Sequence, residues 1–123
     1  MTLREQLETA IQENTILLFI KGNKMFPRCG WSAGVIDIFK SMDVPFETID
    51  ILDDPEIRPT LISISDWPTT PQIFVGGKFI GGGDIVQELH ARGELAPLVE
   101  AALGTTEGVE GAEGAEGAEG AEA

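Results

Sequence analysis

The longest apolar run in the chain is Ile16-Leu17-Leu18-Phe19-Ile20. Five residues are too few for a buried helix, and the residue types favour a strand. Because no polar residue alternates with the apolar ones, we expect both faces of this strand to be buried, as in a central strand with a parallel neighbour. Helices from the flanking segments should then cover both faces of a sheet.

Helical patterns lie on both sides of this strand. Thr2 and Glu5 match a capping box, which predicts a first helix directly after Thr2. After a loop over residues 22–28, a second helix is expected over residues 30–42. The side chains that should face the core are Leu3, Leu7, Ala10 and Ile11 in the first helix and Val35, Ile38, Phe39 and Met42 in the second.

The middle of the chain predicts a strand over residues 46–51, followed by a third helix. Asp54 followed by Pro55 is typical of an N-cap and a first helical position. Pro59 lacks a backbone donor, so we expect a distorted first turn or a regular helix that begins later. The side chains that should face the core are Ile57, Leu61 and Ile64.

A hairpin is expected over residues 72–80, because Gly76-Gly77 supplies the positive φ angles that a two-residue turn needs. Asp84 is placed to cap a fourth helix, and residues 94–103 predict a fifth. This order combines a right-handed βαβ unit with an antiparallel hairpin. The predicted fold class is α/β, with a four-stranded mixed sheet flanked by about five helices.

Composition excludes several classes of protein and site. The chain has 123 residues with one cysteine, 8 Lys and Arg, 21 Asp and Glu, and a net charge of −13. One cysteine excludes an intramolecular disulfide, a CxxC redox pair and a metal site of four cysteines from one chain. The acidic balance argues against binding nucleic acid or an anionic membrane surface. The longest apolar run is far shorter than the roughly 20 residues of a membrane helix.

Residues 105–123 differ in composition from the rest of the chain. They hold six glutamates and no lysine or arginine, and the triplet EGA repeats. This composition predicts a disordered acidic tail, and residues 1–104 are expected to form one domain. The first residues carry acids and lack a hydrophobic run, so we expect a cytoplasmic protein, or one of a mitochondrial or plastid matrix if Met1 is not the native start.

Open sheets bind ligands beyond the carboxyl ends of their parallel strands, so the segment after Ile20 is the place to look for a site. Cys29 would stand at the amino end of the second helix, where unpaired backbone N–H groups favour a negative charge. Lys21, Lys24 and Arg28 lie within the nine positions that end at Cys29. This setting lowers the pKa of a thiol, so we expect a reactive thiolate, although a buried, inert cysteine is the usual alternative.

Two motifs carry a resemblance to a known family. The first is K-G-x(4)-P-x-C-G-W-S at residues 21–32, and the second is W-P-T-T-P-Q-I-F-V-G-G-K-F-I-G-G-G-D at residues 67–84. Together they resemble the monothiol (CGFS-type) glutaredoxins of the thioredoxin-like superfamily, over essentially all of residues 1–104. The resemblance implies a thioredoxin-like (glutaredoxin) fold and a site for glutathione.

The resemblance also implies roles for individual residues. Cys29 matches the active-site cysteine, and Lys21 and Arg58 match residues that hold the glycine carboxylate of glutathione. Thr70 and Pro71 match a cis-proline turn whose backbone pairs with the cysteinyl unit. Gly83 and Asp84 match the position that binds the γ-glutamyl end. These roles suit a ligand that carries two carboxylates and an ammonium group.

The chain departs from the family pattern at two positions. Trp31 stands where the family has phenylalanine, and Gly83 stands where many members have a second cysteine. We expect the larger aromatic ring to narrow access to the thiol or to shield a bound cofactor. No disulfide can join Cys29 to position 83.

Thiol chemistry and ligand counting lead to two hypotheses. Ser32 stands where a dithiol enzyme has its resolving cysteine, so we expect at most weak, glutathione-dependent oxidoreductase activity. A [2Fe–2S] cluster takes four thiolates, and the resemblance implies that two chains and two glutathiones supply them, with Cys29 as the metal ligand of each chain. The leading hypothesis is a monothiol glutaredoxin that binds this cluster at a dimer interface and transfers it. The alternative is a glutathione-dependent thiol–disulfide oxidoreductase that removes glutathione from proteins.

The partners follow from the same resemblance. The cluster-loaded protein should be a homodimer, and apo iron–sulfur proteins should accept the cluster. Members of the family also pair with BolA-like proteins. No nucleic acid and no membrane is expected among the partners.

Overall fold

The computed structural model describes residues 1–104, and the predicted acidic tail over residues 105–123 lies outside the described residues. By its contacts the chain divides into two compact units, Met1–Ala91 and a second unit that begins at Arg92. The first unit holds the whole sheet and four helices, and the second contains helix α5 (Leu95–Gly104). Among the described residues, no helix has the length and apolar character needed to cross a membrane.

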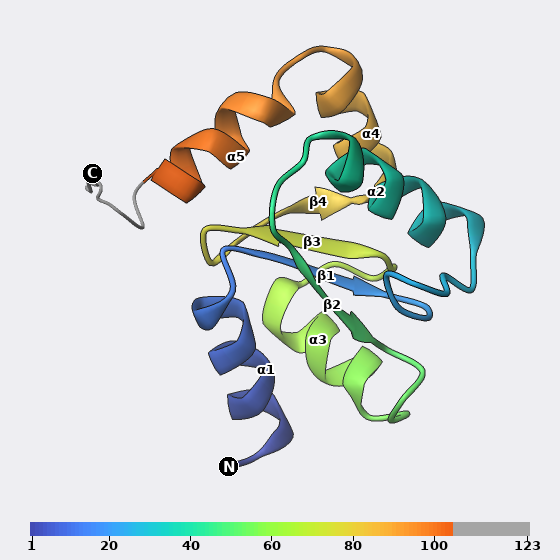
Figure 1. Cartoon of the computed structure of the whole chain (residues 1–123). Helices are drawn as coiled ribbons and strands as arrows, with labels where there is room; N and C mark the ends of the chain where they lie inside the picture. Colours follow the sequence, from blue (N-terminus) through green and yellow to red (C-terminus); the bar gives the residue numbers. More distant parts are fainter. Residues whose placement is uncertain (105–123) are drawn as a thin grey trace. The chain divides into compact units, whose positions relative to one another are not determined.

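The sheet of the first unit is mixed, as predicted. Its strands lie in the order β2-β1-β3-β4, where β1 pairs parallel with β2 and antiparallel with β3, and β3 pairs antiparallel with β4 (Figure 1). Every residue of β1 is buried, which confirms the prediction of a central strand with a parallel neighbour. The strands are β1 (Ile16–Ile20), β2 (Glu47–Asp50), β3 (Gln72–Val75) and β4 (Lys78–Gly82).

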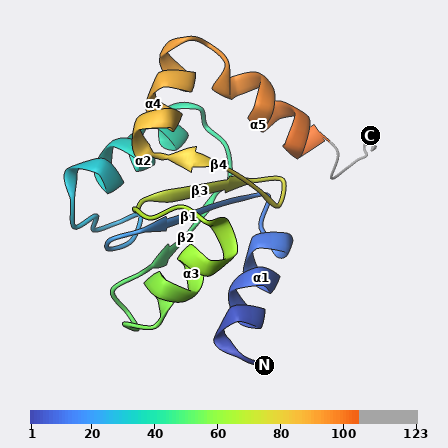
Figure 2. The same ribbon diagram turned by 180° about the vertical axis from the view of Figure 1, so that it is seen from behind.

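Two helices of this unit lie on each face of the sheet (Figures 1 and 2). Helices α1 (Leu3–Glu13) and α3 (Ile57–Ser65) lie on one face, and α2 (Gly30–Ser41) and α4 (Gly83–Ala91) lie on the other. The predicted capping box begins α1, because Thr2 Oγ1 accepts the Glu5 N–H at 3.1 Å and Glu5 Oε1 accepts the Thr2 N–H at 2.9 Å. The hairpin turns at Gly76 and Gly77, which both have positive φ, as predicted.

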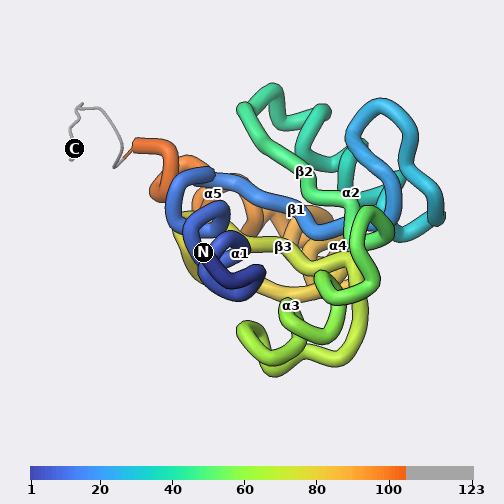
Figure 3. Tube along the Cα trace, turned by 90° about the horizontal axis from the view of Figure 1, so that it is seen from below, coloured from blue at the N-terminus to red at the C-terminus, as the bar shows by residue number. Residues whose placement is uncertain are grey.

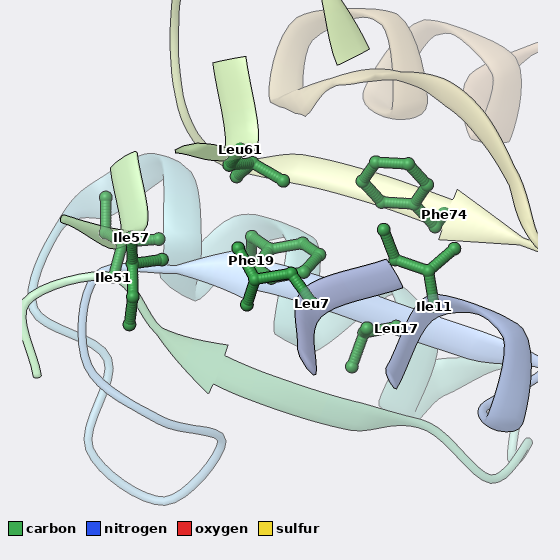
Figure 4. Close-up of a cluster of buried hydrophobic side chains, with 8 residues drawn as sticks. All are labelled: Leu7, Ile11, Leu17, Phe19, Ile51, Ile57, Leu61 and Phe74. Carbon is green, nitrogen blue, oxygen red and sulfur yellow. The ribbon is translucent and has the colours of Figure 1, made fainter. Parts of the chain in front are cut away.

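A cluster of buried apolar side chains joins α1 and α3 to the sheet (Figure 4). The rings of Phe19 and Phe74 lie edge to face, with 5.6 Å between their centroids. Neighbouring residues of β1 point to opposite faces, so Leu17 and Phe19 enter this cluster while Leu18 points to the face of α2 and α4. The members of the cluster are Leu7, Ile11, Leu17, Phe19, Ile51, Ile57, Leu61 and Phe74.

Val35 and Phe39 of α2 are buried, as predicted, but the rest of its inner face differs from the prediction. Ile36 is buried, whereas Ile38 and Met42 are half-buried. The buried stripe of this helix also includes Ser32, a polar side chain with no exposed surface. A stripe predicted from apolar residues alone cannot include a buried serine. The predicted stripe therefore lay nearer to the C-terminal end of the helix than the observed one.

Two predicted helix caps are wrong. Helix α3 begins at Ile57 and not at Pro55, and Asp54 Oδ1 accepts the Glu56 N–H at 2.9 Å in the turn before the helix. Pro59 then falls in the first turn, where a missing N–H removes no helical hydrogen bond. Of the two alternatives expected for Pro59, a distorted first turn or a regular helix that begins later, the structure shows the later start. Asp84 does not cap α4, because this helix already begins at Gly83. Asp84 lies in the first turn, where the helix dipole favours an acid.

Candidate functional site

The site lies where β1 ends and α2 begins, on the right of Figure 1. The connecting loop projects beyond the end of β1 in Figure 3. Gly22 pairs with Pro27 in an isolated bridge, and its φ is 92°. A Cβ at Gly22 would lie 2.3 Å from the carbonyl oxygen of Phe26, so only glycine fits. The closed loop brings the Arg28 N–H to the Lys21 carbonyl at 2.8 Å and places the following residue beside β1.

Cys29 is the N-cap of α2, and its thiol is partly exposed. Its Sγ accepts the Ser32 N–H at 3.3 Å and lies 3.1 Å from Ser32 Oγ. Burial raises the pKa of the Cys29 thiol, but hydrogen bonds from the Ser32 side chain and from the backbone N–H groups of Ser32 and Trp31, together with the charge of Lys21, hold it below the ordinary value of 9.0. This geometry supports a reactive thiolate.

The direction of the Ser32 hydroxyl follows from its partners. Ser32 Oγ accepts the backbone N–H of Lys21 at 3.1 Å and lies 3.1 Å from Cys29 Sγ. A thiolate has no proton to give, so the hydroxyl is the donor whenever Cys29 is ionised. The side chain has no exposed surface, which removes competition from water. The motif identified Ser32 only as the residue in place of a resolving cysteine, and nothing in its spacing indicated a hydrogen bond to the sulfur.

The three predicted cations do not all act on the thiol. Lys21 is the base whose charge lowers the pKa of Cys29. Lys24 instead faces β2, where its Nζ donates to the Phe46 carbonyl at 2.7 Å and lies 3.4 Å from Glu47 Oε1. Its ammonium group also lies 5.0 Å from the centre of the Phe46 ring. Lys24 therefore anchors the loop to the sheet.

A pocket of about 310 Å³ lies at the N-terminus of α4, between α2 and the segment that leads into β3. Four of the predicted glutathione positions line it, and the peptide bond between Thr70 and Pro71 is cis, as the resemblance implied. Trp31 and Thr69 line it too, although they were not predicted as site residues. Trp31 lies in the first family motif and Thr69 in the second, so their positions in these motifs could have indicated that they belong to the site. The full lining is Trp31, Thr69, Thr70, Pro71, Gly83 and Asp84.

The two predicted carboxylate-binding cations lie outside this lining. Arg58 is exposed on α3, and its Nη2 donates to the Pro68 carbonyl at 3.0 Å. Its remaining guanidinium N–H groups can still bind a carboxylate. Lys21 is exposed at the end of β1 and is linked to the site through its charge on Cys29. The structure thus places Arg58 beside residue 68 and Lys21 near Cys29, and their role in binding a carboxylate stays a prediction.

The two departures from the family pattern are neighbours in space. A Cβ at Gly83 would lie 3.0 Å from Cε3 of Trp31 and 3.2 Å from Cγ of Pro71. The indole of Trp31, which is 51% exposed, therefore rests over the bare Cα of Gly83. A side chain at position 83 could enter only if the ring moved.

Known proteins of one family match this chain. The glutaredoxin family model matches residues 16–80. A Synechocystis protein named "Uncharacterized monothiol glutaredoxin ycf64-like" is 41% identical over 102 residues, which make up 83% of this chain and 95% of that protein. Other relatives are longer, and the chain spans 29% of the length of the bovine and human proteins named Glutaredoxin-3.

Solved structures show the same fold. Reduced, apo GrxS14 of poplar in solution is 42% identical, with a TM-score of 0.75 over 82% of this chain and 93% of that chain. A buckwheat glutaredoxin in complex with glutathione is 26% identical, with a TM-score of 0.72 over 80% of this chain and 88% of that chain. The chain belongs to the glutaredoxin family of the thioredoxin-like superfamily and is a monothiol member of it.

Proposed function

We propose that this glutaredoxin binds glutathione beside Cys29 and carries a glutathione-ligated [2Fe–2S] cluster, as cargo, at the interface of two chains. The observation that carries the proposal is the Ser32 hydroxyl, which lies 3.1 Å from Cys29 Sγ. It stabilises the thiolate as a ligand, yet it cannot resolve a disulfide as a second thiol would. The site therefore favours holding a ligand over rapid thiol–disulfide turnover.

The pocket offers the groups that a tripeptide with two carboxylates and an ammonium requires. At the N-terminus of α4, the backbone N–H groups and the Asp84 carboxylate suit the γ-glutamyl end. The backbone of Thr70 and Pro71 suits the cysteinyl unit, and Lys21 and Arg58 suit the glycine carboxylate. A buckwheat relative was solved in complex with glutathione, which supports glutathione as the ligand.

The donor set suits a shared cluster. Cys29 is the only cysteine of the chain, and its thiolate is a soft ligand that is partly exposed at the start of a helix. Two chains supply two thiolates, and two glutathiones complete the four that a [2Fe–2S] cluster takes. Because half of the ligands are small molecules that can dissociate, such a cluster suits transfer. The proposal includes apo iron–sulfur proteins as acceptors and a BolA-like protein as a partner.

The test is reconstitution with iron, sulfide and glutathione. We expect cluster absorption in the visible spectrum and a shift from monomer to dimer on a sizing column, and we expect both to be lost in Cys29→Ser. The variant Lys40→Ala is a matched control, because it removes a base at the far end of α2. No absorption, absorption that Cys29→Ser leaves unchanged, or a size that loading leaves unchanged would contradict the proposal.

The second candidate function is removal of glutathione from proteins, which the lowered pKa of Cys29 favours. Here the Cys29 thiolate attacks the glutathione sulfur of a protein–glutathione disulfide and releases the protein thiolate. A second glutathione thiolate then attacks the disulfide on Cys29, which gives glutathione disulfide and restores the Cys29 thiolate. A glutathione-coupled reduction assay distinguishes the two functions, because the cluster carrier should show little turnover.

The location of the protein and its domain boundary stay predictions. We expect a cytoplasmic protein, or one of an organelle matrix if Met1 is not the native start. We propose residues 1–104 as the glutaredoxin domain, followed by the acidic tail.

A further inference from the structure

The pocket wall between α3 and β3 is held by side chains. This segment, residues 67–71, contains two prolines without an N–H and lies outside every helix and strand. Three consecutive carbonyls of the segment nevertheless accept hydrogen bonds. Gln72 Nε2 donates to the carbonyls of Trp67 at 3.0 Å and Thr69 at 3.1 Å, and Arg58 Nη2 donates to that of Pro68 at 3.0 Å.

Gln72 differs from Arg58 in its burial. Its side chain has no exposed surface, whereas Arg58 is exposed. Within the described residues, Gln72 Oε1 has no hydrogen-bond partner. Burying an amide with an unpaired oxygen is unfavourable, and an apolar side chain would avoid that cost. The favourable contribution of the Gln72 amide is therefore its two hydrogen bonds to the Trp67 and Thr69 carbonyls.

We propose that Gln72 is a positioning residue for the ligand pocket, acting through the Trp67 and Thr69 carbonyls to hold Thr69 and Thr70 in place. Gln72 does not line the pocket itself, but both threonines do. This inference rests on the proposed function, in which glutathione occupies the pocket.

The wall and the thiol are held by separate sets of bonds. The pKa of Cys29 depends on Ser32, the Trp31 N–H and Lys21, which belong to β1 and α2 or the residues beside them. None of these bonds involves residues 67–72. Loss of the Gln72 amide should therefore weaken ligand binding and leave the chemistry of the thiol unchanged.

The experiment replaces Gln72 in two ways. Gln72→Met keeps an unbranched side chain without the amide, and Gln72→Glu keeps the shape but turns an oxygen toward the two carbonyls. We expect glutathione affinity, measured by NMR titration, to fall about tenfold in Gln72→Met and further in Gln72→Glu. The pKa of Cys29, measured from the pH dependence of iodoacetamide alkylation, should stay at the wild-type value in Gln72→Met, which adds no charge.

Ile73→Val is the matched control for stability. Ile73 is the next residue of β3, is fully buried and points to the opposite face of the sheet. The variant removes a methylene group without touching the wall carbonyls. Equal loss of affinity in Ile73→Val and Gln72→Met, at an equal loss of Tm, would overturn the positioning role.

A measurement without ligand separates this inference from the proposed function. If wild-type protein does not bind glutathione, the proposed function fails, and the role of Gln72 is decided by backbone order parameters. We expect lower order parameters for Thr69 and Thr70 in Gln72→Met, with those of Cys29 to Ser32 unchanged. Order parameters equal to wild type at both threonines would show that Gln72 does not hold the wall.

Discussion

The core beneath α1 and α3 and the edge that carries the site are stabilised in different ways. In the core, side chains such as Phe19, Leu61 and Phe74 make contacts that have no direction. At the edge, two buried polar side chains make directional hydrogen bonds: Ser32 bonds to the Cys29 sulfur, and the Gln72 amide nitrogen donates to two carbonyls. Changes in the core should therefore cost mostly stability, whereas changes at the edge should alter thiol chemistry or ligand affinity.

The largest effect on stability is expected for Phe19→Ala. The ring is fully buried and contacts Phe74, so its removal should lower the free energy of unfolding by about 3–5 kcal/mol, measured by urea denaturation. The more conservative Phe19→Leu should lose clearly less. The pKa of Cys29 should stay the same in both variants while they remain folded. A shift of that pKa in the folded Phe19→Leu protein would show that the two regions are not separate.

Ser32→Ala should affect both stability and chemistry. It leaves the Lys21 N–H without its buried acceptor, which should cost about 1–3 kcal/mol. It also removes the hydroxyl donor to Sγ, so the pKa of Cys29 should rise and alkylation at neutral pH should slow. Ser41→Ala, at the exposed end of α2, is the control and should do neither. An unchanged thiol pKa in Ser32→Ala would show that the hydroxyl points elsewhere.

The dependence of stability on pH follows from the same thiol. The pKa of Cys29 in the folded protein is lower than its ordinary value of 9.0, so between the two values the unfolded chain binds more protons. The contribution of Cys29 to folding is therefore complete above pH 9.0 and is lost as the pH falls through the folded pKa. Unfolding free energies across this window should rise with pH more steeply in wild type than in Ser32→Ala. Parallel curves would contradict this linkage.

The smallest effect is expected for the contact between Trp31 and Gly83. Gly83→Ala places a methyl group 3.0 Å from the indole, but the ring is half exposed and can move. We expect a coupling energy of about 1 kcal/mol in a double-mutant cycle with Trp31→Ala. If the effects of Gly83→Ala and Trp31→Ala on stability are additive, the Trp31 ring moves away from position 83 without cost. In a Trp67→Phe background, the fluorescence of Trp31 should report its displacement by Gly83→Ala.

Much of the fold was predictable because its signals are local. The run at residues 16–20 predicted a buried central strand, and the glycine pair at the hairpin predicted the turn. The caps at Asp54 and Asp84 failed because a capping side chain is only one of several influences on where a helix begins. In α3, Pro59 is accommodated in the first turn, and α4 follows β4 without a break.

For the candidate site, the two family motifs predicted which residues lie near one another. Thr70, Pro71, Gly83 and Asp84 were predicted from the family resemblance, and the structure places them in one pocket. The hydrogen bonds that organise the site were not predictable, because a motif gives residue types and their spacing but does not say which polar atoms face one another. The bond from the Lys21 N–H to Ser32 spans 11 residues, and the bond from Arg58 to Pro68 spans 10. Lys24 was counted with the thiol's cations because its contact with β2 is invisible in sequence.

The Ser32 hydrogen bond also has a consequence for any disulfide that Cys29 forms. A sulfur in a disulfide carries no negative charge, so it gains much less from the hydroxyl and from the backbone N–H groups at the start of α2. These groups regain a strong acceptor when the disulfide is cleaved so that Cys29 leaves as the thiolate and the negative charge returns to Sγ. Cys29 is thereby a good leaving group when a thiolate attacks the sulfur bonded to it. Slow turnover at this site would therefore come from the lack of a resolving thiol in the chain and not from the departure of Cys29.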